Sequence, residues 1–145
     1  LVNGSGAPYD FIAAGDGRGY AELMTPAALA NIAAFADGIG VAAGLVLPTT
    51  PAGTVAPPTA LVADAHAAGL AVHTWTLRAE NHFLPPELHR PRGGTPQGAQ
   101  PEDWGDLAAW VRAHLEAGVD GFFTDHPFIG RQAVDAWWRA VRATA

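Results

Sequence analysis

The sequence predicts an α/β fold in which helices alternate with parallel strands. Helical and strand-like segments follow one another in regular order, and a helix is the usual connection between two parallel strands. The clearest strand spans Leu70–Leu77, which is rich in β-branched and aromatic residues and follows Gly69. The clearest helix carries Leu107, Trp110 and His114 along one stripe. These patterns indicate a parallel sheet packed against amphipathic helices.

Composition is typical of one compact domain and argues against two classes of partner. The chain has 145 residues, of which 49% are hydrophobic and 15% are charged. The net charge is −6 and all eight basic residues are arginines, whereas a nucleic-acid partner would require a basic face. No apolar run approaches the roughly 20 residues needed to span a bilayer. We therefore expect neither a nucleic-acid partner nor a membrane span.

Several catalytic chemistries are excluded or disfavoured by residue types. The chain has no cysteine and no lysine, which excludes thiol nucleophiles, cysteine-ligated zinc and Schiff-base chemistry. Ser5 is the only serine and lies in no Gly-x-Ser-x-Gly motif, so serine hydrolysis is not expected. The six histidines show no paired metal-binding spacing, so we expect no zinc site within the chain.

The first 24 residues are expected to be irregular because glycine and proline interrupt every periodic pattern. Within them, Gly15–Gly19 invites comparison with a phosphate-binding loop. This segment lacks the Gly-Lys-Ser/Thr ending of such a loop and follows no clear strand, which favours a plain loop.

The rest of the chain alternates between helix and strand. The first helix has the residue types of a helix start, with Thr25 as N-cap and Pro26 in the first turn. The expected segments, in chain order, are a helix from Pro26 to about Ala36, a short strand Ile39–Val41, a loop Ala42–Pro58, a helix Thr59–Ala68, the strand Leu70–Leu77, a long loop Leu84–Gln100, a helix Glu102–Ala117, a strand Val119–Thr124 and a helix Phe128–Ala143.

The strand from Leu70 carries the residues that look most functional. Alternation places Leu70, Val72, Thr74 and Thr76 on one face, and Ala71, His73, Trp75 and Leu77 on the other. Polar side chains follow at once, namely Arg78, Glu80, Asn81 and His82. Ligands of α/β proteins are held at the carboxyl ends of parallel strands, so this end of the strand is a candidate site.

Three blocks of the sequence resemble the glycerophosphodiester phosphodiesterase family. They are YAELMTPAALANIAAFADGIG at residues 20–40, LAVHTWTLRAENHFLP at residues 70–85 and GVDGFFTDHP at residues 118–127. The resemblance implies that residues 1–145 are a partial domain, the C-terminal part, with about three βα units, of a TIM barrel. The block at residues 78–85 is similar to a branch of the family with a long loop after this strand, often periplasmic or secreted.

The resemblance also implies an activity, which is hydrolysis of a glycerophosphodiester to glycerol 3-phosphate and an alcohol. In this family a divalent ion, Ca²⁺ or Mg²⁺, is held by carboxylates, and two histidines act as acid and base. The family's His-Arg-Gly and Glu-x-Asp motifs do not occur in this chain. Because Leu1 is not a methionine and no signal peptide follows it, we expect the chain to begin in mid-protein. Because the family's catalytic and metal-binding motifs are missing, the resemblance implies that this chain holds no metal and no catalytic residue and is inactive alone.

Three residues are the candidate substrate contacts, each with a structural alternative. Trp75 would pack against the glycerol carbons or fill the core. Arg78 would meet the phosphate or pair with Glu80 or Glu87. Asp125 would orient a ligand hydroxyl or an upstream arginine, or cap the last helix. We expect loop-capping hydrogen bonds from Asn81 and His82, and a buried core histidine at His73.

Two other functions stay open at this point. One is a non-catalytic remnant that folds only by self-association or with a partner chain. The other is a small flavodoxin-like binding module with its ligand at the strand ends, although the phosphate-cradling first turn of such a module is missing.

Overall fold

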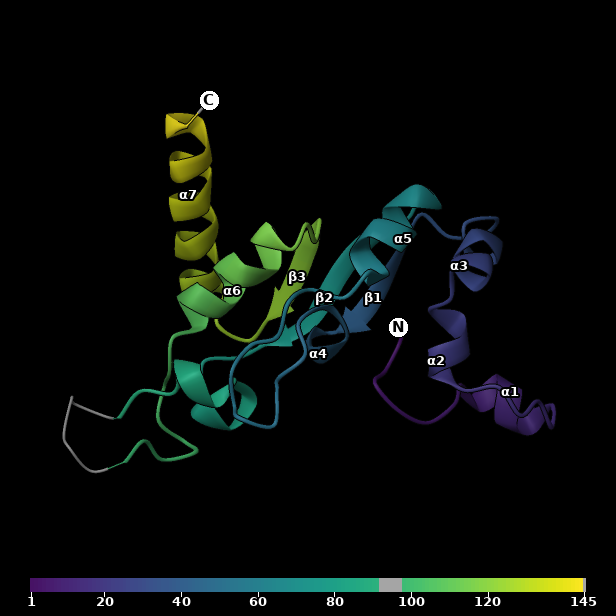
Figure 1. The fold of residues 1–145 in the computed structure, drawn as a ribbon, viewed down its shortest axis with the longest axis horizontal. Coiled ribbons are helices and arrows are strands. Elements are labelled where there is room, and N and C mark those ends of the chain that lie inside the picture. Colours follow the sequence, from purple (N-terminus) through teal and green to yellow (C-terminus); the bar gives the residue numbers. More distant parts are fainter. Residues whose placement is uncertain (92–97, 145) are drawn as a thin grey trace.

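A three-stranded parallel sheet forms the centre of the molecule, in strand order β1-β2-β3 (Figure 1). The computed structural model describes residues 1–91 and 98–144. Its elements are α1 (Tyr9–Ala13), α2 (Tyr20–Leu23), α3 (Pro26–Ile32), β1 (Gly38–Ala42), α4 (Ala43–Val46), α5 (Leu61–Ala67), β2 (Ala71–Leu77), the 3-10 turns η1 (Asn81–Phe83) and η2 (Pro86–Leu88), α6 (Leu107–Glu116), β3 (Gly121–Thr124) and α7 (Pro127–Ala143). The α/β class and the parallel strands are therefore confirmed.

Helices cover one face of the sheet and bury the core there. Ile39 and Val41 of β1 lie in register with Val72 and Thr74 of β2, and all four side chains are buried. Helices α4, α5 and α6 contact β2 on this side, and α7 packs against α6 (Figure 1). The described residues leave the opposite face, which carries His73, open. Among them no helix has the length and apolar character needed to cross a bilayer.

The helix starts and stops follow the residue types that predicted them. Thr25 accepts a hydrogen bond from the Ala28 N–H (3.3 Å), and Pro26 opens α3. Gly69 and Gly118 follow α5 and α6 with φ of +84° and +92°, a conformation that glycine adopts without steric cost.

Four expectations about the elements need correction. Residues 1–24 contain α1 and α2, and the loop Ala42–Pro58 contains α4, because helices this short leave no periodic pattern. Helix α3 ends in turns from Ala33 onward and does not reach Ala36. Helix α6 begins at Leu107 instead of Glu102, since the Asp106 carboxylate accepts from the Ala109 N–H (2.9 Å) and fixes the N-cap there.

The alternation of β2 also slips by one residue near its end. Thr74 pairs with Phe122 and Leu77 pairs with Thr124, so three steps along β2 match two steps along β3. Leu77 is buried in the hydrophobic core, although simple alternation placed it with His73 and Trp75. Such a bulge redirects the residues that follow it.

Candidate functional site

An ion pair joins the carboxyl ends of β2 and β3. Arg78 follows β2 and Asp125 follows β3, and the Arg78 Nε lies 2.6 Å from the Asp125 Oδ2. Because the strands are parallel, both ends lie at one edge of the sheet. The side chains are 37% and 55% exposed, so water screens the attraction and the pair adds at most about 1 kcal/mol to stability. Its main consequence is positional, since it places a guanidinium at the strand ends.

The Arg78 guanidinium also contacts an aromatic ring. Its Cζ lies 4.6 Å from the centre of the Phe83 ring in η1. A carboxylate on one side and a ring on the other restrict the rotation of this long side chain. Guanidinium groups carry five N–H donors and match phosphate oxygens well, so the held group is suited to bind an anion.

Trp75 lies near the same end of β2, on the open face of the sheet. It pairs with Ala42 of β1, and its indole lies beside Gly40, where an added methyl carbon would be 3.7 Å from the Trp75 Cδ1. The indole Nε1 is buried and has no hydrogen-bond partner within residues 1–91 and 98–144. Because this nitrogen is buried, the indole can offer a ligand only apolar ring surface.

A second contact between the strand ends involves His126, directly after Asp125. The Ala79 N–H donates to the His126 Nδ1 (3.3 Å), and the other ring nitrogen, Nε2, lies 3.9 Å from the Glu80 Oε1. The Trp104 ring meets the His126 ring edge to face, with 4.8 Å between the ring centres. The imidazole thus lies between the segment after β2 and the segment before α6.

Asn81 organises the long loop that follows. It is buried, and its Nδ2 donates to the carbonyl oxygens of Arg90 and Gln100 (both 2.9 Å). Its Oδ1 accepts from the Arg90 N–H at 3.1 Å. The loop-capping interpretation of Asn81 is therefore confirmed. Residues 92–97 of the expected loop Leu84–Gln100 lie outside the described part.

His73 is exposed, so the expectation of a buried core histidine is wrong. Its ring meets the Phe123 ring at 6.2 Å between centres, on the open face of the sheet. Within the described residues, a hollow of about 330 Å³ lies beside both rings, and Leu1 and Gly40 also line it. Among residues 1–91 and 98–144 no helix covers this side, and strand alternation alone cannot tell which face of a sheet the helices cover.

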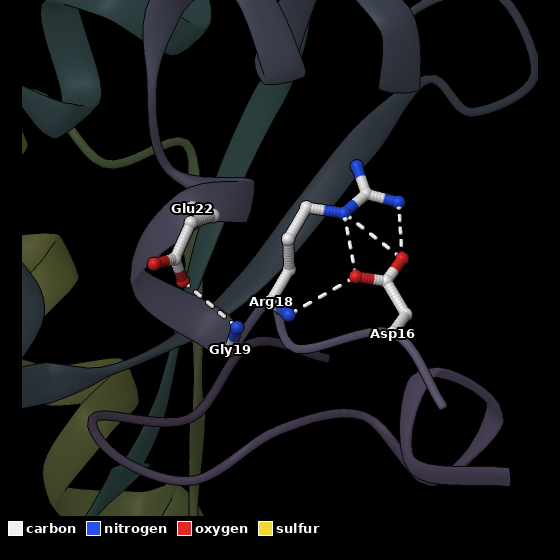
Figure 2. A network of polar contacts seen from close by, with 4 residues as sticks. All are labelled: Asp16, Arg18, Gly19 and Glu22. Atoms are coloured by element: carbon white, nitrogen blue, oxygen red, sulfur yellow. Dashed lines mark hydrogen bonds and ion pairs between the residues drawn. The ribbon is translucent and has the colours of Figure 1, made fainter. Parts of the chain in front are cut away.

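The segment Gly15–Gly19 is held by the carboxylates of Asp16, within it, and Glu22, in α2 (Figure 2). The Asp16 carboxylate accepts from the Arg18 backbone N–H (3.0 Å) and from the Arg18 guanidinium (2.6 Å), which lowers the pKa of Asp16. Glu22 accepts from the Gly19 N–H at 2.8 Å. The Arg18 and Gly19 donors are therefore already bonded to carboxylates, which supports the plain-loop interpretation.

His114 and Asp120, which lie outside this edge, also have shifted pKa values. Burial lowers the pKa of His114, and hydrogen bonds to the carbonyls of Trp110 (2.9 Å) and Ala43 (3.4 Å) oppose this shift. Burial raises the pKa of Asp120, but hydrogen bonds from Val72 and His66 outweigh it and the net pKa is lowered. Both groups serve the packing of the sheet and its helices.

The structure decides between some of the structural roles that were expected for Arg78 and Asp125. Arg78 pairs with Asp125, and neither Glu80 nor Glu87 is its ionic partner; Glu87 accepts from the Val55 N–H instead (2.7 Å). Asp125 does not cap α7, whose N-cap residue is His126. Of the roles expected for Asp125, contact with an arginine that precedes it in the chain is the one observed, and that arginine is Arg78. Contact of Trp75, Arg78 and Asp125 with a substrate stays a prediction.

Sequence reasoning named Glu80 at this strand end but missed His126 and Trp104 as its neighbours. His126 directly follows the candidate residue Asp125, and this position is the signal that could have found it. Nothing in the sequence indicates that Trp104 reaches the same place. Among the described residues, no three His, Asp or Glu side chains converge in a way that could hold a metal ion.

Comparison with known proteins gives two matches. The model of the glycerophosphoryl diester phosphodiesterase family matches residues 5–128. The chain is also 33% identical over 106 residues to "Glycerophosphodiester phosphodiesterase GDPD6" of Arabidopsis thaliana. This alignment covers 73% of the chain and 24% of the relative, so the chain spans about a quarter of the relative's length.

Proposed function

The chain belongs to the glycerophosphoryl diester phosphodiesterase family, and from this premise we propose that it forms part of an enzyme that hydrolyses glycerophosphodiesters. The products would be glycerol 3-phosphate and an alcohol. The observation that carries the proposal is the Arg78 guanidinium, held by Asp125 at the carboxyl ends of β2 and β3. This edge is where barrel enzymes bind their substrates.

We propose that three residues contact the glycerol phosphate part of the substrate. Arg78 donates to the phosphate oxygens and offsets their negative charge. Asp125 holds the guanidinium in place from the neighbouring strand. Trp75 packs its indole ring against the glycerol carbons. These residues bind and orient the substrate, and none of them supplies a proton or a nucleophile.

The complete enzyme is proposed to use a divalent metal, Ca²⁺ or Mg²⁺, which would stabilise charge on the phosphodiester. The residues of this chain do not fit such an ion by themselves. No three ligands converge within residues 1–91 and 98–144, and at the strand ends Asp125 faces Arg78. The metal ligands and the acid–base pair would therefore come from the family's other motifs. We accordingly propose that residues 1–145 alone have no hydrolytic activity.

A second proposal concerns self-association of these residues when they are alone. The open face of the sheet exposes His73, and Phe123 beside it is 53% exposed. Exposed aromatic side chains of this kind favour contact with another apolar surface. The non-catalytic alternative, a remnant that folds by association with a copy or a partner, rests on this observation.

For the complete enzyme we propose a periplasmic or secreted location, supported by the resemblance at residues 78–85.

Steady-state kinetics of arginine variants test the binding role. In the full-length protein, Arg78→Ala is expected to raise KM for glycerophosphocholine roughly tenfold or more, because a charge-assisted contact worth about 1.5–3 kcal/mol is lost. Arg78→Lys keeps the charge but not the planar donors, so its KM should lie between those of the wild type and Arg78→Ala. Trp75→Ala should raise KM through lost apolar contact. Unchanged KM in both Arg78→Ala and Trp75→Ala would remove this edge from the site.

A further inference from the structure

We propose that His126 is a positioning residue that fixes the Arg78 guanidinium by binding the neighbouring Ala79 amide. This inference rests on the proposed function, because it gives Arg78 the role of phosphate contact. Two adjacent residues after β2, Arg78 and Ala79, are bound by two adjacent residues after β3, Asp125 and His126. The imidazole supplies the less exposed of these two links.

Burial makes the His126 link the more rigid one. The His126 side chain is 13% exposed and Ala79 is fully buried, whereas Arg78 and Asp125 are both more than a third exposed. Leaving a buried N–H without an acceptor costs about 1–3 kcal/mol, while an exposed ion pair is screened by water. The imidazole therefore contributes a buried link that helps to hold the backbone beside Arg78.

The hydrogen bond also fixes which ring nitrogen carries the proton. Since Nδ1 accepts from the Ala79 N–H, the neutral ring carries its proton on Nε2. That nitrogen faces the Glu80 carboxylate at 3.9 Å, and the Trp104 ring contacts the imidazole from the side. Carboxylate and indole together keep the ring in the orientation that Ala79 requires.

The other side of Ala79 is bound as well. The Gly105 N–H donates to the Ala79 carbonyl at 2.7 Å, and Glu80 pairs with Trp104 in an isolated antiparallel bridge. Ala79 is thus bound through its N–H by His126 and through its carbonyl by Gly105. Loss of the imidazole acceptor would free one side of this residue and, with it, the backbone from which Arg78 extends.

Two polar substitutions of similar size separate this role from simple packing. His126→Asn can place its side-chain oxygen where Nδ1 lies and so keep an acceptor for Ala79. His126→Gln reaches the Nε2 position and leaves the Ala79 amide without one. Hydrogen-exchange mass spectrometry of peptides covering residues 77–80 of the full-length protein measures how fast the Ala79 backbone N–H exchanges. Kinetics with glycerophosphocholine report KM and kcat separately.

We expect exchange at Ala79 to become roughly tenfold faster in His126→Gln and to stay within about threefold of wild type in His126→Asn. KM should rise roughly tenfold in the glutamine variant with kcat nearly unchanged, and the asparagine variant should recover most of the loss. Equal exchange in the two variants, or a KM that does not follow the exchange, would overturn the proposal.

Failure of the proposed function gives a different result. A wild-type protein that neither hydrolyses nor binds glycerophosphocholine would refute the proposed function and the link from Arg78 to phosphate. The exchange data would still show whether His126 orders this edge of the sheet. If His126→Gln unfolds, Glu80→Gln offers a second test, because it keeps the side-chain size and removes the charge that faces Nε2. It should loosen Ala79 less than the loss of the imidazole, and no loosening beyond wild type in any folded variant would overturn the proposal.

Discussion

The buried histidine of α6 makes the stability of the fold depend on pH in a predictable direction. His114 is fully buried, and burial lowers its pKa below the ordinary value of about 6.5. The unfolded chain therefore binds a proton more readily than the folded chain between the two pKa values. The stability that the neutral His114 contributes is fully present above about pH 6.5. As the pH falls from there toward the lower pKa of the folded state, the free energy of unfolding decreases by up to about 1.4 kcal/mol per pH unit.

Replacement of His114 isolates this contribution. His114→Leu fills a similar volume and cannot titrate, so its free energy of unfolding relative to wild type should be nearly constant above about pH 6.5 and should improve as the pH falls from there to pH 5. Val111→Ala serves as the control, since it removes buried volume from the same helix and its cost should not vary with pH. Urea unfolding of the three proteins at several pH values measures the differences. A constant difference between His114→Leu and wild type across this range would refute the reasoning.

Two further substitutions test other buried polar groups. Thr74 has a buried hydroxyl with no partner in the described part of the chain, so Thr74→Val should raise the free energy of unfolding by about 1 kcal/mol in urea titrations, and a loss of that size would contradict the assignment. Asn81→Ala removes the hydrogen bonds to Arg90 and Gln100, so it should cost about 2 kcal/mol and speed proteolysis at Arg90; an unchanged cleavage rate would show that other contacts hold the loop.

Local sequence signals were enough to predict most of the fold. The N-cap at Thr25 and the glycines after α5 and α6 are read from single residues, and the three strands follow from short apolar runs between them. Such features depend on backbone sterics and on neighbours within a few positions. The short helices α1, α2 and α4 were not predicted, because four or five residues cannot show a helical period.

The sequence predicted some residues of the candidate site but not the contacts that depend on tertiary packing. Arg78 and Asp125 could be chosen because each follows a strand, and parallel strand ends meet at one edge. The bulge in β2 depends on pairing with β3, so the sequence of β2 alone does not contain it. The contact between Trp104 and His126 joins a loop to a strand end, and tertiary packing alone produces it.

The most direct test of the central claim is product release by the full-length protein and by residues 1–145 alone. Each purified protein is incubated with glycerophosphocholine and Ca²⁺ or Mg²⁺, and glycerol 3-phosphate is measured. We expect release by the full-length protein and none by residues 1–145, because we propose that these residues bind the substrate and that the acid–base pair and the metal ligands come from other motifs of the family. Metal-dependent release by residues 1–145 would contradict the account and place catalysis among side chains assigned here to structure. No release by the full-length protein would contradict the proposed activity itself.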